Sequence, residues 1–129
     1  MNDKAQRILI VDDNVALARV IQFAMDGAGF ETVTAQNGQI AFELAKESLF
    51  DVVITDQQMP EMTGVDLCRN LRGMPEYRDC PIILLTAKGL ELELPRLQHE
   101  FEIDATFSKP FSPSALVKTV NELLAAAVS

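Results

Sequence analysis

Cysteine is scarce in the sequence, which contains two cysteines, one tyrosine and no tryptophan. Cys68 and Cys80 are too few and wrongly spaced for a zinc site, so we expect both to be reduced thiols. No apolar run approaches the roughly 20 residues that a transmembrane helix needs, and residues 1–7 do not resemble a secretory leader. These absences favour a cytoplasmic protein.

Basic side chains are also scarce, with 11 Lys and Arg against 19 Asp and Glu, which gives a formal net charge of −8. A surface with this excess of negative charge repels phosphate backbones and anionic headgroups, so we expect no direct binding to nucleic acid or to membranes. The composition, 48% hydrophobic and 23% charged, is typical of a folded globular protein. A chain of 129 residues has room for one domain with one core.

Apolar runs of two kinds alternate along the chain. Short β-branched runs are typical of strands covered on both faces, and they occur at residues 8–11, around Val33, and at residues 52–55, 82–85 and 105–107. Apolar residues three or four positions apart predict helices, which we expect around residues 17–25, 40–45, 65–71 and 116–127.

The remaining segment, residues 88–101, is the least regular. Leu90 to Leu94 alternate with period two, and Pro95 then predicts a helix that starts late with the proline in its first turn. The last helix is better marked, with Ser112 as its predicted N-cap and Pro113 at its first position. The whole alternation predicts an α/β fold, a doubly wound five-stranded parallel sheet with helices on both faces.

Polar side chains follow four of the five predicted strands. Open parallel sheets bind ligands outside the carboxyl ends of their strands, so these side chains should converge on one edge. The first strand leads into an acidic pair, the third into a single aspartate, the fourth ends on a threonine, and the fifth leads into a serine and a lysine. In this order the residues are Asp12, Asp13, Asp56, Thr86, Ser108 and Lys109.

Three carboxylates at one edge need positive charge, because two unit charges about 4 Å apart repel by roughly 4 kcal/mol at an effective dielectric constant near 20. Lys109 supplies one such charge. Mg²⁺ is the natural second, because it accepts a few carboxylates and keeps waters for a phosphate-bearing substrate. A carboxylate beside these cations can attack phosphorus, and the Thr86 hydroxyl can then bind the transferred group.

Four motifs carry a resemblance to a known family: Asp12-Asp13-Asn14, Asp56-Gln57-Gln58-Met59-Pro60-Glu61-Met62-Thr63-Gly64, Thr86-Ala87 and Lys109-Pro110-Phe111. In this order and at these separations, the chain resembles the receiver domain of bacterial two-component response regulators along essentially its whole length. The resemblance implies the flavodoxin-like strand order 2-1-3-4-5. It also implies a single receiver domain over residues 1–129, without an output domain, similar to stand-alone chemotaxis regulators.

The resemblance implies a phosphoacceptor rather than an enzyme. Asp56 would take a phosphoryl group from a phosphohistidine of a sensor kinase or a histidine phosphotransfer protein. Asp12, Asp13 and Asp56 would hold Mg²⁺ together with the backbone carbonyl of Gln58.

The family also implies a switch. Lys109 would pair with the phosphoryl oxygens, Thr86 would move to bind them, and the Lys109-Pro110 peptide bond would be cis. The chain would assist its own phosphorylation and dephosphorylation, and it would change its binding to a downstream protein in phosphorelay signal transduction.

The chain departs from the family pattern at two places. Family members usually carry Tyr or Phe three residues before the Lys-Pro pair, where this chain has Thr106. Strand alternation directs the next residue, Phe107, to the opposite face, so it is not a substitute. The second departure is Glu102-Ile103-Asp104, which replaces the usual Gly-Ala turn before the last strand.

Other functions are less compatible with the sequence. A phosphohydrolase of the haloacid dehalogenase type needs an aspartate two residues after its nucleophile, and that position is Gln58. A flavodoxin-type or dinucleotide carrier needs a glycine-rich phosphate loop after the first strand, where this chain has Asp12 and Asp13. A receiver fold that binds partners without phosphorylation remains an alternative, because Thr106 replaces the usual aromatic residue.

Overall fold

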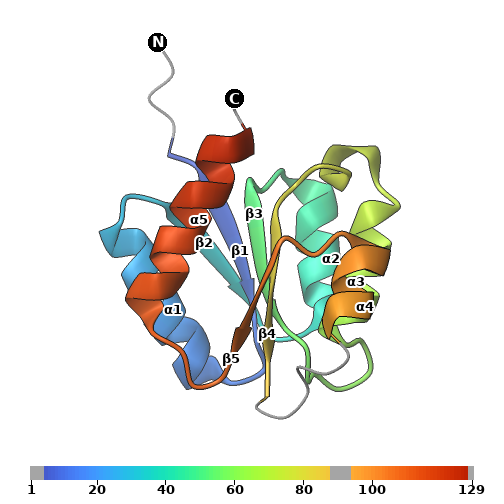
Figure 1. The fold of residues 1–129 in the computed structure, drawn as a ribbon, viewed down its shortest axis with the longest axis horizontal. Coiled ribbons are helices and arrows are strands. Elements are labelled where there is room, and N and C mark those ends of the chain that lie inside the picture. The colour runs from blue at the N-terminus through green and yellow to red at the C-terminus, as the bar shows by residue number, and fades with distance from the viewer. Residues whose placement is uncertain (1–4, 88–93, 128–129) are drawn as a thin grey trace.

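The computed structural model describes residues 5–87 and 94–127, so the alternating segment that begins at Leu90 lies largely outside the described residues. Strands and helices alternate along the chain (Figure 1). In order they are β1 (Arg7–Val11), α1 (Val15–Gly27), β2 (Glu31–Ala35), α2 (Gly38–Glu47), β3 (Val52–Asp56), α3 (Gly64–Arg72), the 3₁₀ helix η1 (Pro75–Tyr77), β4 (Ile82–Thr86), α4 (Leu94–Phe101), β5 (Ala105–Ser108) and α5 (Pro113–Ala127).

The strands form one parallel sheet in the order β2-β1-β3-β4-β5. Helices α1 and α5 cover one face of the sheet, and α2, α3 and α4 cover the other (Figure 1). Successive residues of β1 point to opposite faces. Ile8 and Ile10 therefore pack in the core under α1 and α5, and Leu9 and Val11 in the core under α2 and α3. This arrangement confirms the predicted fold class and strand order.

Local sequence sets most of the helix boundaries. The Asn14 side chain accepts a hydrogen bond from Leu17 N and caps α1. Ser112 Oγ accepts from Ala115 N before α5, which begins at Pro113, so both predictions for this helix are confirmed. Helix α4 begins at Leu94 and has Pro95 in its first turn, also as predicted.

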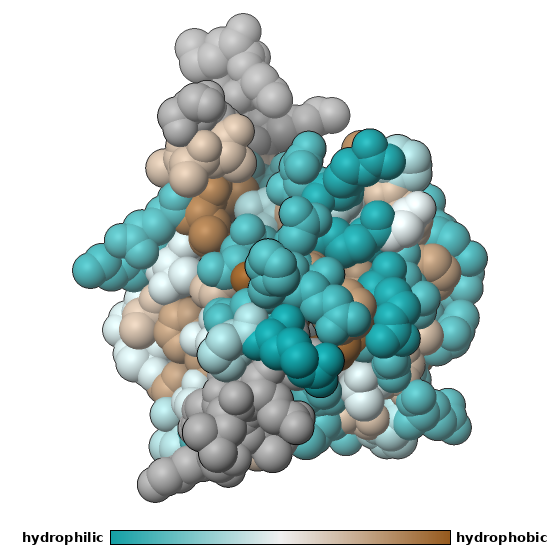
Figure 2. Space-filling model, turned by 45° about the vertical axis from the view of Figure 1, so that its right-hand side comes forward, coloured by the Kyte–Doolittle hydropathy of each residue, from teal (hydrophilic) through white to brown (hydrophobic). Residues whose placement is uncertain are grey.

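The apolar face of α1 is shifted from the predicted one. Ile21 and Met25 are buried, but Val20 is 48% exposed, and Ala18 takes its place against the sheet. Seen from the side of α3 and α4, the surface is mainly hydrophilic (Figure 2). Among the described residues, no helix combines the length and the apolar character that crossing a bilayer requires.

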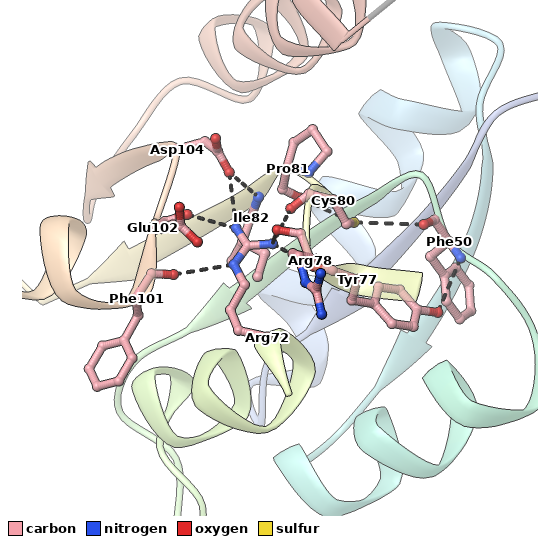
Figure 3. Close-up of polar contacts among 10 residues, drawn as sticks. All are labelled: Phe50, Arg72, Tyr77, Arg78, Cys80, Pro81, Ile82, Phe101, Glu102 and Asp104. Atoms are coloured by element: carbon pink, nitrogen blue, oxygen red, sulfur yellow. Dashed lines mark hydrogen bonds and ion pairs between the residues drawn. The ribbon is translucent and has the colours of Figure 1, made fainter. Parts of the chain in front are cut away.

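Arg72, the last residue of α3, bonds with the loop before β4 and with the turn between α4 and β5 (Figure 3). These segments precede β4 and β5, so they lie at the end of the sheet away from the carboxyl ends of the strands. The Arg72 guanidinium donates to the carbonyls of Tyr77 at 2.6 Å and Cys80 at 2.8 Å, before β4. It also donates to the carbonyl of Glu102 at 2.7 Å, in the turn between α4 and β5. Further bonds reach the carbonyls of Phe101 and Arg78 and the Asp104 carboxylate. One side chain thus ties the end of α3 to the loop before β4 and to the turn before β5.

Tyr77 makes a second long-range link, between η1 and the end of α2, and Figure 3 shows its bond with Phe50. Its ring is fully buried, its hydroxyl donates toward the carbonyls of Ala45 at 2.8 Å and Ser48 at 3.0 Å, and it accepts from Phe50 N at 3.3 Å. Burial raises the pKa of the Tyr77 hydroxyl, so it stays neutral and can both donate and accept. The 3₁₀ helix has no counterpart among the predicted elements, because its anchoring contacts lie about 30 residues away.

We expect Arg72→Lys to lower the free energy of unfolding by about 2 kcal/mol, because an ammonium cannot span the acceptors that the planar guanidinium reaches. Arg69→Lys is the matched control, since Arg69 lies one turn earlier on α3 with 61% of its side chain exposed. This control should change stability by no more than about 0.5 kcal/mol. Urea unfolding of both variants makes the measurement. Equal stability of Arg72→Lys and the wild type would contradict the role assigned to Arg72.

Candidate functional site

The carboxyl ends of four strands bring the predicted site residues together at one edge of the sheet, the lower edge in Figure 1. Thr86 is the last residue of β4, as predicted, whereas Asp56 is the last residue of β3 instead of following it. Asp12 and Asp13 come directly after β1, and Lys109 directly after β5. Ser108 ends β5 rather than entering the loop.

The three aspartates form one acidic cluster. One carboxylate oxygen from each of Asp12, Asp13 and Asp56 lies within 4.8 Å of the others. Asp12 and Asp56 are 1% and 2% exposed, whereas Asp13 is exposed to solvent. Lys109 Nζ lies 3.2 Å from Asp56 Oδ1 and 3.5 Å from Asp12 Oδ2, so the lysine is paired with the two buried members of the cluster.

The charges of this cluster are not balanced. Burial raises the pKa of Asp56, the negative charges of Asp12 and Asp13 add to the rise, and the Lys109 ammonium acts in the opposite direction. The cluster thus holds three carboxylates, and among the described residues the Lys109 ammonium is the one cation paired with it. An all-oxygen set with excess negative charge fits a hard divalent cation such as Mg²⁺.

Thr86 ends the strand next to the one that carries Asp56, and its hydroxyl forms no hydrogen bond with the acidic cluster. The residue is fully buried, and Thr86 Oγ1 has no hydrogen-bond partner among the described residues. Asp56 Oδ1 likewise accepts no hydrogen bond there and has the ion pair with Lys109 as its contact. Leaving such groups unsatisfied costs about 1–3 kcal/mol each. The cost indicates a site arranged for a group that brings its own donors and acceptors.

The loop after Asp56 folds tightly onto the strand. A Cβ atom on Gly64 would clash with the Asp56 carbonyl oxygen, so glycine is required where α3 begins. Gln57 fixes the same helix end: its carbonyl accepts from Gly64 N at 3.1 Å and its side-chain Oε1 from Val65 N at 2.8 Å. Sequence reasoning missed this role of Gln57, since its partners are set by the path of the loop.

Gln58, predicted as a metal ligand through its backbone carbonyl, also has a side-chain role that the sequence did not indicate. Its Oε1 accepts a hydrogen bond from Ala87 N at 3.1 Å. Ala87 directly follows Thr86, so this bond connects the loop after β3 with the end of β4.

The last strand shows how the chain departs from the family pattern. Thr106 pairs with Leu84 and Phe107 with Leu85. Phe107 packs in the core under α1 and α5, with its ring centroid 6.0 Å from that of Phe111. It therefore lies on the face opposite Thr106, as strand alternation predicts. The Lys109-Pro110 peptide bond is cis, as the resemblance implied.

Comparison with known proteins supports the resemblance to receiver domains. The sequence matches the response regulator receiver domain over residues 8–121. It is 39% identical over 121 residues to the transcriptional regulatory protein SrrA of Staphylococcus aureus. The matched region covers 93% of this chain and 48% of SrrA. The chain thus spans about half the length of the curated relatives it matches.

Solved structures share the fold. The chemotaxis protein CheY4 of Vibrio cholerae is 29% identical, with a TM-score of 0.87 over 93% of this chain and 99% of that one. A putative response regulator from Chloroflexus aurantiacus is 32% identical, with a TM-score of 0.87 over 95% and 99%. The receiver domain of the sensor histidine kinase PA1611 of Pseudomonas aeruginosa, 24% identical with a TM-score of 0.84 over 95% and 99%, shares the fold. Fold, site geometry and sequence agree, and the chain belongs to the response regulator receiver domain family.

Proposed function

We propose that this receiver domain accepts a phosphoryl group on the Asp56 carboxylate and that phosphorylation switches its binding to a partner protein. Phosphorylation-dependent switching is the typical function of the family. The observation that carries the assignment is the position of Asp56, buried 3.2 Å from Lys109 Nζ and clustered with Asp12 and Asp13. No histidine or cysteine shares this cluster, so the carboxylate is the natural nucleophile among the described residues.

The same cluster supports a magnesium site. Asp12, Asp13 and Asp56 would hold the ion with the backbone carbonyl of Gln58. When bound, Mg²⁺ supplies positive charge to the phosphoryl oxygens, where negative charge develops during transfer. The structure of the Pseudomonas aeruginosa PA1611 receiver domain, which shares this fold, has a magnesium ion coordinated in its active-site cleft.

The donor is a phosphohistidine of a histidine kinase or a phosphotransfer protein, the class with which receiver domains interact. An Asp56 oxygen forms a bond to phosphorus while the bond between phosphorus and the donor nitrogen breaks. The imidazole leaves with the electron pair and takes a proton from water. Lys109 pairs with a phosphoryl oxygen, and the Thr86 hydroxyl donates to another, which gives it the partner that it lacks among the described residues.

The chain assists this transfer as a stoichiometric acceptor, and the same residues would assist the later loss of the phosphoryl group. The formal net charge of −8 disfavours nucleic acid as the direct partner, so we assign the switched interaction to a downstream protein in the cytoplasm.

Incubation with Mg²⁺ and acetyl phosphate should add one phosphoryl group to the wild-type chain, and Asp56→Asn should abolish the addition because an amide is not a nucleophile toward phosphorus. Asp51→Asn is the matched control, since Asp51 is exposed just before the other end of β3. Intact mass spectrometry makes the measurement. An unmodified wild-type mass, with the fold intact, would support the alternative of a binding module that works without phosphorylation.

Magnesium should stabilise the fold. A ligand that binds the native state alone adds about 2.7 kcal/mol to the free energy of unfolding at 100 times its Kd. We expect this gain to be largely lost in Asp13→Asn, which removes a carboxylate of the cluster, and kept in Asp79→Asn, which alters an exposed aspartate in the loop before β4. Urea unfolding with and without Mg²⁺ tests this. Equal gains in the two variants would contradict the assigned ligand set.

The variant Lys109→Ala distinguishes the role of the lysine ammonium from the role of Mg²⁺. The rate of phosphorylation by acetyl phosphate should fall by about 100-fold, because a preformed positive group no longer stabilises the transferred oxygens. Affinity for Mg²⁺ should not weaken, since the loss of the ammonium leaves the carboxylates less neutralised. Stopped-flow kinetics and metal titration give the two values. Loss of both in equal measure would contradict the separate roles.

A further inference from the structure

The hydrogen bond between Gln58 and Ala87 joins the loop after β3 to the residue that follows β4. Gln58 is an exposed residue two positions after Asp56, and Ala87 directly follows the buried Thr86. The Gln58 Oε1 atom accepts from Ala87 N at 3.1 Å, across 29 positions of the sequence. The side chain therefore links the segment that carries the acceptor aspartate to the segment that carries the threonine hydroxyl.

The loop that carries Gln58 is firmly anchored. Gln57, its neighbour, donates through its own N–H to Leu85 O at 2.8 Å. The same residue accepts from Gly64 N and, through its side chain, from Val65 N. Gln58 therefore extends from a segment that is held in place, so we expect its side chain to restrain the movement of Ala87.

The partner peptide unit is held at both of its polar groups. Its carbonyl, Thr86 O, accepts from Lys109 N at 2.8 Å, and its amide, Ala87 N, donates to Gln58 Oε1. The first bond continues the backbone pairing between β4 and β5. The second depends on one exposed side chain. Thr86 Oγ1, attached to the residue that supplies this carbonyl, is the buried hydroxyl without a partner among the described residues.

We propose that the Gln58 side chain is a latch that holds the Thr86-Ala87 peptide in its resting position and thereby sets how readily the site engages a phosphoryl group. Resting on the function proposed above, this makes Gln58 a positioning residue. For Thr86 Oγ1 to reach a group on Asp56, the Thr86-Ala87 peptide shifts and its amide leaves Gln58. A hydrogen bond of this kind contributes about 1 kcal/mol, which corresponds to a population change of about fivefold.

Gln58→Met tests the latch, because methionine keeps the length of the side chain and removes the oxygen acceptor. Amide hydrogen exchange at Ala87, followed by NMR without Mg²⁺ or a phosphodonor, should become about 2–10 times faster. Gln58→Glu keeps an acceptor oxygen and should preserve the protection. Gln39→Met is the matched control, since Gln39 is an exposed glutamine on α2 that is bonded to Glu43.

The second measurement is the affinity for beryllofluoride, a phosphoryl mimic, in the presence of Mg²⁺. Gln58→Met should bind it about 2–10 times more tightly than the wild type, because the cost of opening the latch is removed. Gln39→Met should match the wild type. Melting temperatures within the wild-type range establish that each variant is folded.

The outcomes separate the two proposals. Unchanged exchange at Ala87, or faster exchange with unchanged beryllofluoride affinity, would overturn the latch while leaving phosphorylation at Asp56 in place. If the wild type binds no beryllofluoride, or if Asp56→Asn binds it equally well, the proposed function fails. The exchange measurement then still reports whether Gln58 restrains Ala87.

Discussion

Three carboxylates repel one another at the carboxyl edge of the sheet, and the surrounding fold has to hold them together against that repulsion. Two of them, Asp12 and Asp56, are almost fully buried, where charges interact more strongly than in water. The Lys109 ammonium offsets part of the repulsion, and the pKa of Asp56 is still raised. Such an arrangement is unfavourable for stability alone, and it is consistent with the proposal that this edge of the sheet binds a cation and a phosphoryl group.

The scaffold tolerates this cost because the strands beneath the site are buried on both faces. Residues of β1, β3 and β4 alternate between two apolar cores, one on each side of the sheet. The loop after Asp56 is held by Gly64, which permits close approach, and by Gln57, whose side chain caps the start of α3. Backbone geometry, more than contact between the charged groups, keeps the carboxylates close together.

At the other end of the sheet, Arg72 stabilises the turn before β5, where the chain departs from the family pattern. Where the family usually has Gly-Ala, this chain has Glu102-Ile103-Asp104, and Glu102 adopts a positive φ of 53°. Such a conformation is costly for a residue other than glycine. Arg72 donates to the Glu102 carbonyl and to the Asp104 carboxylate, which also accepts from Ile82 N. The unusual turn is thus stabilised by a partner some 30 residues earlier.

Local sequence patterns were enough to predict the alternation of strands and helices, the doubly wound fold, and the residues that meet at the carboxyl edge. These follow from local periodicity and from what stands at each strand end, both of which are properties of short segments. Other features could be seen only in the folded chain: Val20 of α1 is half exposed, Arg72 bonds with two turns, and Gln58 reaches Ala87. Each of these depends on which distant backbone groups come within hydrogen-bonding or packing distance, and no short stretch of sequence encodes that.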